Sequence, residues 1–509
     1  MTDPLRDALP VTAGRLAALV GEPSTRPAYA ALAAAIRTLA VDGRLPPQVR
    51  LPSERELAVA LGLSRTTVTR AYAELTAAGW AHPRVGSGTF LALPGRREVL
   101  PGALVPQEGV ALDLTAAAAT CVPGTQALVE RAVARLPALL RGPGYEPVGL
   151  PALRAAIAAR YAARGLPTDP DQLVVTSGAL AGIALVARTV LRRGDRALVE
   201  NPTYPSAVGA LRATGARLLP VPVGPRDGLD LDVALAALRA ARPRLAYLVP
   251  DHHNPTGHVL PDGSRAALAA GIAAAGGTAL VDESLAELVL DAAHDGEPPA
   301  PFAAHLPGAY SVGSLSKPLW GGVRVGWVRC PTAQVAALQA ARLTLDLGAS
   351  ALDQLIGTEF LEAELLAGDG PGPLLTARLA GLRTLRDGWL AALAAHAPGW
   401  TARTPRGGLA LWVGLPDPVG LELAEAALRR GVALAAGPRF TSDGSARDRI
   451  RLPLTADVAD PAATVRLLVE AYAEVVAGGA AGGVAGAAGG AAGGGRGAGA
   501  PAQAPPLIA

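Results

Sequence analysis

Apolar residues follow two different patterns along the chain, and the change of pattern divides it into two units. In residues 1–92, apolar positions recur every three or four residues, as in amphipathic helices. In residues 112–475, short β-branched or leucine-rich runs alternate with helical segments rich in alanine, leucine and arginine. This alternation predicts an α/β domain with a largely parallel sheet.

The segments between and after these units lack such a pattern. Residues 93–111 contain proline and glycine at short intervals, which is typical of a linker. Residues 476–509 are rich in alanine and glycine and carry too few large apolar side chains to offset the entropy of ordering. We therefore predict two domains joined by a linker and followed by a disordered tail.

The first unit is predicted to contain three helices. The first helix spans residues 27–41. The second begins at Ser53, where the side chains of Ser53 and Glu56 can form a capping box. The third begins at Ser64, and its positions i, i+3, i+4 and i+7 are apolar and face inward: Val68, Ala71, Tyr72 and Leu75.

The third helix and the segment after it suit a DNA groove. The side chains left outside, or at the leading end of this helix, are arginines and hydroxyls: Arg65, Thr66, Thr67, Thr69 and Arg70. Arginine can read guanine in the major groove, and threonine can bind phosphate. Residues 80–84 and 88–91 would form a two-stranded wing after this helix. A helical adaptor with a solvated face has the same periodicity, so the pattern alone leaves DNA binding open.

Three motifs in this unit carry a more specific signal. They are LPSERELA at residues 51–58, LSRTTV at 63–68 and GSGTF at 86–90. Together they closely resemble the GntR-type winged helix-turn-helix. The resemblance implies double-stranded promoter DNA as a partner, contacted by the following residues: Arg55, Ser64, Arg65, Thr66, Thr67, Gly86, Ser87 and Gly88.

Charge and cysteine content limit the partners, sites and cellular compartment that we expect for this protein. The net charge is only +3, so DNA contact requires a local basic surface, and residues 1–91 carry an excess of 10 − 7 = +3. The two cysteines, Cys121 and Cys330, lie far apart without metal-ligand spacing, so we expect reduced thiols, no metal site and a cytoplasmic protein. No charge-free apolar run reaches about eighteen residues, so we expect no membrane span.

Lys317 is the only lysine in the sequence, and the other forty-five basic side chains counted with it are arginine. A composition that uses arginine wherever a positive charge suffices keeps lysine where arginine cannot act. A primary amine can lose its proton and form a Schiff base with an aldehyde, whereas a guanidinium effectively cannot. Lys317 is therefore either a remnant of arginine-biased drift or the amine that holds pyridoxal phosphate.

Residues suited to each part of pyridoxal phosphate follow the predicted strands, where open α/β sheets place their ligands. The strands are predicted at residues 173–176, 197–200, 245–249, 279–281 and 310–312. The candidates beyond their ends are a phosphate cradle (Ser177, Gly178, Ala179), an aromatic ring (Tyr204), an amide (Asn254), a carboxylate for the ring nitrogen (Asp282) and two phosphate ligands (Ser314, Arg324). Each alone has an ordinary explanation as a turn, a cap or a packing residue. Their order around the only lysine favours a cofactor site.

This ordered set resembles the fold-type I aminotransferases of the aspartate aminotransferase superfamily over about residues 112–475. The motifs that carry the resemblance lie at residues 145–150, 254–257, 314–317 and 451–452. The resemblance implies a large, mostly parallel sheet with a small C-terminal lobe. It also implies a Schiff base at Lys317, with Asn254 on the phenolic oxygen of the cofactor and Tyr204 stacked on its ring.

Two further roles follow only from this resemblance. Tyr145 would reach a phosphate in the neighbouring subunit, which implies a homodimer, and Arg451 would clamp the carboxylate of an amino-acid ligand. The sequence departs from the family at Ser284, two residues after the ring-nitrogen Asp282, where a tyrosine is usual. The shorter hydroxyl is expected to affect turnover more than cofactor binding.

A winged helix joined to an aminotransferase-like domain resembles the MocR subgroup of GntR regulators. The resemblance implies a transcriptional regulator whose large domain senses pyridoxal phosphate or an amino compound. An active aminotransferase with a vestigial DNA-binding module is the alternative, and a cofactor-binding scaffold without DNA affinity is a third. The fusion itself favours the regulator, because a catalyst has no need of a winged helix.

Overall fold

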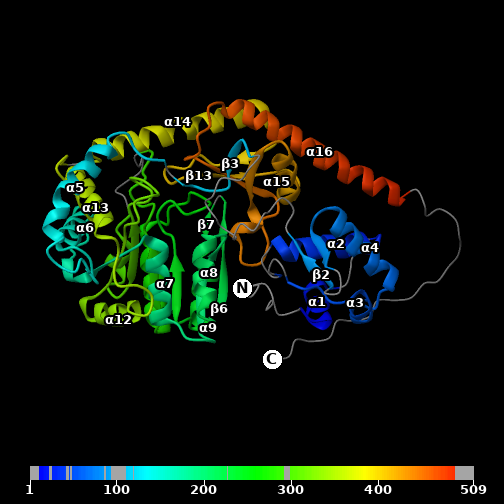
Figure 1. Ribbon diagram of the computed structural model, residues 1–509, viewed down its shortest axis with the longest axis horizontal. Coiled ribbons are helices and arrows are strands. Elements are labelled where there is room, and N and C mark those ends of the chain that lie inside the picture. The colour runs from blue at the N-terminus through cyan, green and yellow to red at the C-terminus, as the bar shows by residue number, and fades with distance from the viewer. Residues whose placement is uncertain are drawn as a thin grey trace, which may run out of the picture.

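The computed structural model describes residues 11–21, 26–41, 45, 49–84, 88–92, 110–118, 120–225, 227–291, 299–368 and 370–487. Gly86 and Ser87 of the predicted wing, most of the predicted linker and the end of the predicted tail lie outside these residues. Figure 1 shows the winged-helix unit (blue) at one end of the molecule and the larger domain over the rest.

The first unit contains the predicted helices and hairpin. Its elements are α1 (Ala13–Val20), α2 (Ala28–Val41), α3 (Glu54–Leu61), α4 (Arg65–Ala77), β1 (Ala81–Arg84) and β2 (Gly88–Leu91). Ser53 caps α3 through a complete capping box with Glu56, and Ser64 caps α4. The four predicted inward-facing residues of α4 are buried, which fixes the side of the helix that faces solvent.

Helix α1 has no counterpart among the predicted elements. The Thr12 side chain caps it by accepting a hydrogen bond from the backbone N–H of Arg15, and Leu16 is fully buried in the core of the unit. The helix packs against α2 and α3. Because isolated helices this short are marginal in water, tertiary packing rather than a sequence pattern holds α1 in place.

An eight-stranded sheet forms the centre of the large domain, in the order β4-β11-β10-β9-β8-β5-β6-β7. Its strands are β4 (Leu173–Thr176), β5 (Arg196–Asn201), β6 (Arg217–Gly224), β7 (Gly228–Leu229), β8 (Leu245–Leu248), β9 (Thr278–Asp282), β10 (Tyr310–Ser314) and β11 (Gly326–Arg329). Pairing is parallel from β10 through β9, β8 and β5 to β6, whereas β11 is antiparallel to β4 and β10. All five predicted strands lie in this mostly parallel sheet.

Helices cover both faces of the sheet, because alternate strand residues point to opposite sides. Val174 and Tyr247 pack in one core with α7, α8 and α12, whereas their neighbours Val175 and Leu248 pack in the other core with α5, α6, α9, α10 and α13. The helices are α5 (Thr125–Leu139), α6 (Pro151–Ala163), α7 (Ala179–Val190), α8 (Pro205–Ala213), α9 (Leu231–Ala241), α10 (Asp262–Ala275), α11 (Phe302–His305), α12 (Thr332–Arg342) and α13 (Ala351–Leu365).

A five-stranded sheet, ordered β12-β13-β15-β14-β3, forms the smaller lobe. Its strands are β3 (Leu112–Leu114), β12 (Thr401–Ala402), β13 (Ala410–Gly414), β14 (Val432–Ala436) and β15 (Arg449–Pro453), and α14 (Pro373–His396), α15 (Gly420–Arg429) and α16 (Pro461–Ala487) belong to the same part of the chain. The lobe is C-terminal, as predicted, except for β3. This edge strand comes from the start of the domain and pairs in parallel with β14, so the linker leads directly into the small lobe.

The predicted tail begins later than expected. Helix α16 continues to Ala487, so residues 476–487, expected to be disordered, are helical in the structure, and residues 488–509 lie outside the described part. Alanine has the highest helix propensity, and a helix that is already nucleated extends at little cost. Figure 1 shows α14 and α16 as two long helices on the same side of the molecule. None of the described helices is long and apolar enough to cross a membrane.

Candidate functional site

The candidate amine, Lys317, lies just beyond β10, in the turn that leads to β11. Its Nζ donates a hydrogen bond to the carbonyl oxygen of Ala117 at 2.8 Å. Burial lowers the pKa of Lys317 to about 8, with Arg451 and Arg324 acting in the same direction and Asp282 opposing them. At neutral pH the neutral, nucleophilic fraction of this amine is therefore much larger than that of a lysine with an ordinary pKa.

The candidate carboxylate, Asp282, ends β9 and is buried. Its Oδ2 accepts a hydrogen bond from the Tyr247 hydroxyl at 3.0 Å, and its Oδ1 accepts one from the backbone N–H of Ser284 at 3.0 Å. Burial, and then the charge of Asp282, raise the pKa of Tyr247 well above its usual value. The phenol thus stays a neutral donor and fixes the orientation of the Asp282 side chain.

Tyr247 did not stand out in the sequence. It lies in the middle of the apolar run that forms β8, where an aromatic residue ordinarily fills the core, and its ring is indeed fully buried. Only the parallel pairing of β8 with β9 brings its hydroxyl to Asp282. Pairing across strands is not readable from a single sequence, so no signal could have identified this residue.

The predicted phosphate cradle lies where β4 passes into α7. Gly178 precedes α7 with φ +99°, and no described side chain caps this helix, so its first N–H groups can receive an anion. The Arg324 guanidinium lies over this end and donates to the carbonyl oxygen of Ser177 at 2.9 Å. A Cβ on Gly178 would lie 2.5 Å from Nη2 of Arg324, so this close approach requires glycine.

Ser314 and a neighbour that the sequence did not single out, Ser316, complete this end of the site. The Ser314 hydroxyl donates to the carbonyl oxygen of Val325 at 3.2 Å and accepts from the backbone N–H of Ser316 at 3.1 Å. The Ser316 hydroxyl in turn accepts from Arg324 at 3.2 Å. The two serines therefore hold the turn that carries Lys317 and orient Arg324.

Arg451, the predicted carboxylate clamp, is buried on β15. Its Nη2 donates to the carbonyl oxygen of Thr115 at 2.7 Å, and the guanidinium lies 4.8 Å from the centre of the Phe440 ring. Its Nε is buried and has no hydrogen-bond partner among the described residues. Burial, followed by Arg439, lowers the pKa of Arg451 to about 9, while Tyr204 and Asp113 raise it. A buried guanidinium with an unused donor fits an anionic ligand.

Tyr204 and Asn254 both lie half-buried directly after strands of the large sheet. Tyr204 precedes α8 and interacts electrostatically with both Arg451 and Tyr247, which places it beside the site. Asn254 lies in the turn after β8. The Ser284 hydroxyl is buried without a partner among the described residues, and Ser284 lines a cavity of about 20 Å³ together with Arg164, Glu283 and Ser314.

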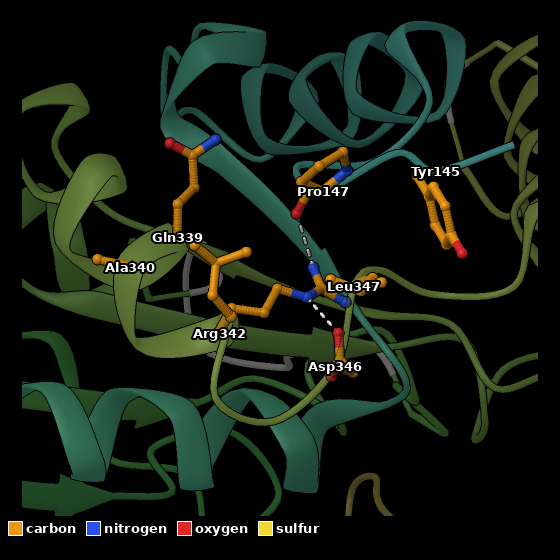
Figure 2. Close-up of a pocket in the computed structure, with 8 residues that line it drawn as sticks. Tyr145, Pro147, Gln339, Ala340, Arg342, Asp346 and Leu347 are labelled. Atoms are coloured by element: carbon orange, nitrogen blue, oxygen red, sulfur yellow. Dashed lines mark hydrogen bonds and ion pairs between the residues drawn. The ribbon is translucent and has the colours of Figure 1, made fainter. Parts of the chain in front are cut away.

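Tyr145 lies apart from this group, at the surface. Its side chain is 63% exposed and lines an open pocket of about 440 Å³ with Pro147, Arg342, Leu343 and Leu347, among others. Figure 2 shows how Arg342 bridges the pocket floor, donating to the carbonyl oxygen of Pro147 at 2.9 Å and to Asp346 at 2.5 Å. None of the other predicted cofactor residues lines this pocket.

Five of the predicted DNA-contacting residues lie on α3 or at the start of α4. Arg55, Ser64, Arg65 and Thr66 are exposed and Thr67 is half-buried. The Ser64 hydroxyl shares hydrogen bonds with those of Thr66 at 2.8 Å and Thr67 at 2.7 Å, which orders the start of α4.

At the wing, Gly88 has φ +100°, and a Cβ there would lie 3.1 Å from Nε of Arg50. Arg50 is exposed and pairs with Phe90 through an isolated β-bridge. The sequence did not single it out, because it precedes the recognisable motif and its position beside the wing depends on this bridge.

Two family models match the chain: "Aminotransferase class I and II" at residues 142–467 and "Bacterial regulatory proteins, gntR family" at residues 28–91. The HTH-type transcriptional regulator TauR of Rhodobacter capsulatus is 32% identical over 342 residues, which cover 60% of this chain and 68% of TauR. The chain belongs to the aminotransferase class I and II family. Because it also carries a GntR-type winged helix, this family member has the domain combination of the MocR subgroup of GntR regulators.

Two other similar proteins are a transcriptional regulator and an aminotransferase. The HTH-type pyridoxine biosynthesis transcriptional regulator PdxR of Corynebacterium glutamicum is 31% identical over 344 residues, which cover 65% of this chain and 72% of PdxR. The crystal structure of LysN, an α-aminoadipate aminotransferase of Thermus thermophilus, superposes with a TM-score of 0.63 at 28% identity and covers 73% of this chain and 94% of LysN.

Membership in this family implies pyridoxal phosphate as the cofactor, and the site fits it on three observations. The pKa of the Lys317 amine is lowered. A glycine-lined cradle with Arg324 can receive a phosphate. The carboxylate Asp282 is held in place by Tyr247 and is not neutralised by an ion pair with a described residue.

Proposed function

We propose that this protein is a transcriptional regulator that binds promoter DNA through its winged helix and senses pyridoxal phosphate, or an amino compound, in its aminotransferase-like domain. The observation that supports the proposal is Lys317, an amine of lowered pKa whose turn also holds the phosphate candidates Ser314 and Arg324, in the same chain as a GntR-type head. A regulator of promoter DNA acts where the DNA is, and we place this one in the cytoplasm.

Each residue has a distinct task in this proposal. Lys317 would hold the cofactor covalently, Asp282 its ring nitrogen, and Arg324 with Ser177, Gly178, Ala179 and Ser314 its phosphate; Asn254 would donate to the phenolic oxygen and Tyr204 would stack on the ring. Pyridoxal phosphate, when bound, supplies an electron sink for chemistry at the carbon that bears a ligand's amino group. Ser284 offers only a short hydroxyl where a tyrosine is usual, and this hydroxyl has no partner among the described residues, so we expect slow turnover but retained binding.

The effector is proposed to be an amine that carries a carboxylate. Arg451 offers a buried guanidinium whose Nε is not bonded to any described group. A carboxylate can engage such a guanidinium with two parallel hydrogen bonds. The surrounding groups would then supply both the amine-reactive end and the acid-binding end of an amino-acid site.

The active form is proposed to be a homodimer. Apolar side chains beside the Tyr145 pocket are strongly exposed: Leu343 at 67%, Leu347 at 51% and Leu345 at 46%. A contiguous exposed apolar patch typically marks a protein interface. Burying this face against a second copy would cover these leucines, and the family resemblance would then bring Tyr145 to the phosphate of the other subunit.

DNA binding and sensing can be tested together on the DNA directly upstream of the gene. Footprints with the purified full chain should appear, and should change when pyridoxal phosphate or candidate amino acids are added. Identical footprints in all conditions would contradict sensing but leave DNA binding intact. For the cofactor, borohydride reduction followed by peptide mass mapping should find the label on Lys317. An unlabelled Lys317 would overturn the cofactor assignment.

A second candidate, a working aminotransferase, is favoured by the extent of the LysN likeness. Steady-state turnover with an amino donor and a keto acceptor, together with absence of DNA binding, would establish it. A half-reaction without turnover is compatible with the regulator.

A further inference from the structure

Arg50 lies on a short stretch of backbone that adds a third strand to the wing hairpin of β1 and β2. The backbone N–H of Leu51 donates to β2 at 2.9 Å, and the carbonyl oxygen of Val49 accepts from β2 at 3.0 Å. Between these two hydrogen bonds, Arg50 and Phe90 form an isolated bridge. Side chains of such a directly opposed pair lie close together on the same face of a sheet. The backbone therefore fixes where the Arg50 side chain starts.

The Arg50 side chain runs along this face towards the end of the hairpin where β1 and β2 are connected. Its partner Phe90 pairs with His82 of β1, and the two rings stack with their centroids 6.0 Å apart. Gly88, two residues before Phe90 on β2, belongs to the same face. A Cβ on Gly88 would lie 3.1 Å from Nε of Arg50 and 3.7 Å from its Cζ. The guanidinium therefore covers Gly88, and only a glycine leaves room for it there.

The positive charge of Arg50 is available for a partner. The residue is exposed, and its side chain makes no ion pair with any described residue. Glu56 interacts with it electrostatically. The Glu56 carboxylate is itself bonded to the backbone N–H and the hydroxyl of Ser53, at 3.1 and 2.9 Å. An exposed guanidinium without a bonded carboxylate can bind an anionic partner with several donors at once.

The backbone that carries Arg50 is also attached to α4. The hydroxyl of Tyr72, on the buried side of α4, donates to the carbonyl oxygen of Pro52 at 2.9 Å, and the capping box of α3 begins at the next residue, Ser53. From the other side, the backbone N–H of Val11 donates to the carbonyl oxygen of Arg50 at 3.2 Å. Arg50 therefore has a fixed position relative to α4, the helix expected to enter the major groove.

We propose that Arg50 enters the minor groove next to the major groove occupied by α4, and that it favours operators with A·T pairs at this position. The major groove, about 12 Å wide, admits a helix, whereas the minor groove, about 6 Å wide, admits only a thin group. A flat guanidinium lying over a glycine is such a group. A narrow minor groove over A·T pairs also has a strongly negative potential, which attracts arginine. The proposal rests on the DNA binding proposed above.

Dimethyl sulfate footprinting of the full chain on the upstream DNA locates both contacts, because the reagent methylates N7 of guanine in the major groove and N3 of adenine in the minor groove. The wild-type protein should protect adenines beside the guanines that it protects. At saturating protein, Arg50→Met should lose the adenine protection and keep the guanine protection. Arg15→Met removes another exposed arginine, on α1, and should keep both. Unchanged adenine protection in Arg50→Met would overturn the proposal.

A second measurement uses the wild-type protein with altered DNA, so it does not depend on how a variant folds. The protected A·T pairs are replaced either by G·C, which places an amino group in the minor groove, or by inosine·C, which lacks that amino group but resembles G·C in the major groove. Affinity should fall roughly tenfold with G·C and change little with inosine·C. Equal losses with both would assign the preference to the major groove and contradict the role of Arg50.

The outcomes separate this inference from the DNA binding on which it rests. Protected guanines without protected adenines would leave α4 as the reading element and show that Arg50 does not enter the minor groove. If the full chain protects no base of the upstream DNA, the proposed DNA binding fails, and this inference fails with it. Adenine protection that is lost in Arg50→Met alone, together with an affinity that distinguishes G·C from inosine·C, supports the minor-groove contact.

Discussion

At the scale of single residues, Asp282 depends on Tyr247 for its orientation. The phenol donates to Oδ2 at 3.0 Å in a fully buried setting. A hydrogen bond to a charged group contributes about 1.5–3 kcal/mol. We expect Tyr247→Phe to weaken pyridoxal phosphate binding by about tenfold or more, measured by absorbance titration of the apo protein. Tyr310→Phe, another buried tyrosine of the same sheet, is the control and should bind normally. Equal affinities for both variants would assign Tyr247 to packing alone.

The amine itself predicts a pH dependence. Only neutral Lys317 attacks an aldehyde, and burial lowers its pKa to about 8 from a usual 10.5. Below the folded pKa the amine is protonated, so the rate of chromophore formation with pyridoxal phosphate should rise with pH up to about 8 and then level off. A lysine of ordinary pKa would keep accelerating to about 10.5. Stopped-flow absorbance across this range distinguishes the two, and Lys317→Ala should give no chromophore.

The sequence identified those site residues whose chemistry is rare, and missed those whose chemistry is common. Lys317 stood out because no other lysine exists. Tyr247 and Ser316 did not, because a tyrosine in an apolar strand and a serine in a turn have ordinary uses. The carbonyl oxygens of Thr115 and Ala117 could not have been found, since every residue has one and only the fold decides which meets a cation.

At the scale of elements, two arginines on α4 are expected to have different roles, one in DNA recognition and the other in stability. Arg65 is exposed, and among the described residues its side chain makes only a long ion pair with Glu54 at 3.8 Å, which stabilises little. Arg70, one turn later, lies over the Tyr29 ring at 4.0 Å. Arg65→Ala should therefore weaken operator binding by about 1–3 kcal/mol without changing the melting temperature. Fluorescence anisotropy with the operator measures the first and thermal unfolding the second.

Arg70→Ala provides the contrast within the same helix. Its loss should lower stability by about 0.5–1 kcal/mol through the cation–π contact, with a smaller effect on DNA binding. Unchanged operator affinity in Arg65→Ala would mean that another element reads the DNA. Arg50, beside the wing glycine Gly88, would then be the next residue to test.

Elements were predictable where their own residues determine them. The five buried strands are short, apolar and bounded by turn residues, and Ser53 and Ser64 mark helix starts by local hydrogen bonds. Helix α1, the pairing of β3 with β14 and the extension of α16 depend on distant packing or on propagation of an existing helix. Tertiary context decides such elements, and a single sequence does not display it.

At the scale of the whole molecule, the order of the chain shows how the proposed ligand site is connected to the winged helix. The linker from the winged helix enters the small lobe through β3, and the carbonyl oxygens of Thr115 and Ala117, which follow β3, accept hydrogen bonds from Arg451 and Lys317. A linker entering at a distant edge of the large sheet would offer no such connection. The winged helix is therefore joined to the domain beside the backbone that contacts Lys317 and Arg451.

In the proposed homodimer, the exposed face around Tyr145 would set the spacing of two such heads. Leu343→Glu places a charge where a second copy would bury an apolar side chain, and an unpaired buried charge costs several kcal/mol. We expect the dimer dissociation constant to rise at least about a hundredfold, seen by sedimentation velocity. Affinity for an operator with two half-sites should fall far more than affinity for a single half-site, because the paired heads no longer bind as one unit. Leu366→Glu is the matched control, since Leu366 is 88% exposed at the end of α13 and does not line the Tyr145 pocket. If both variants sediment like the wild type, the leucines near Tyr145 do not form the subunit interface, and the two heads must be brought together by another surface.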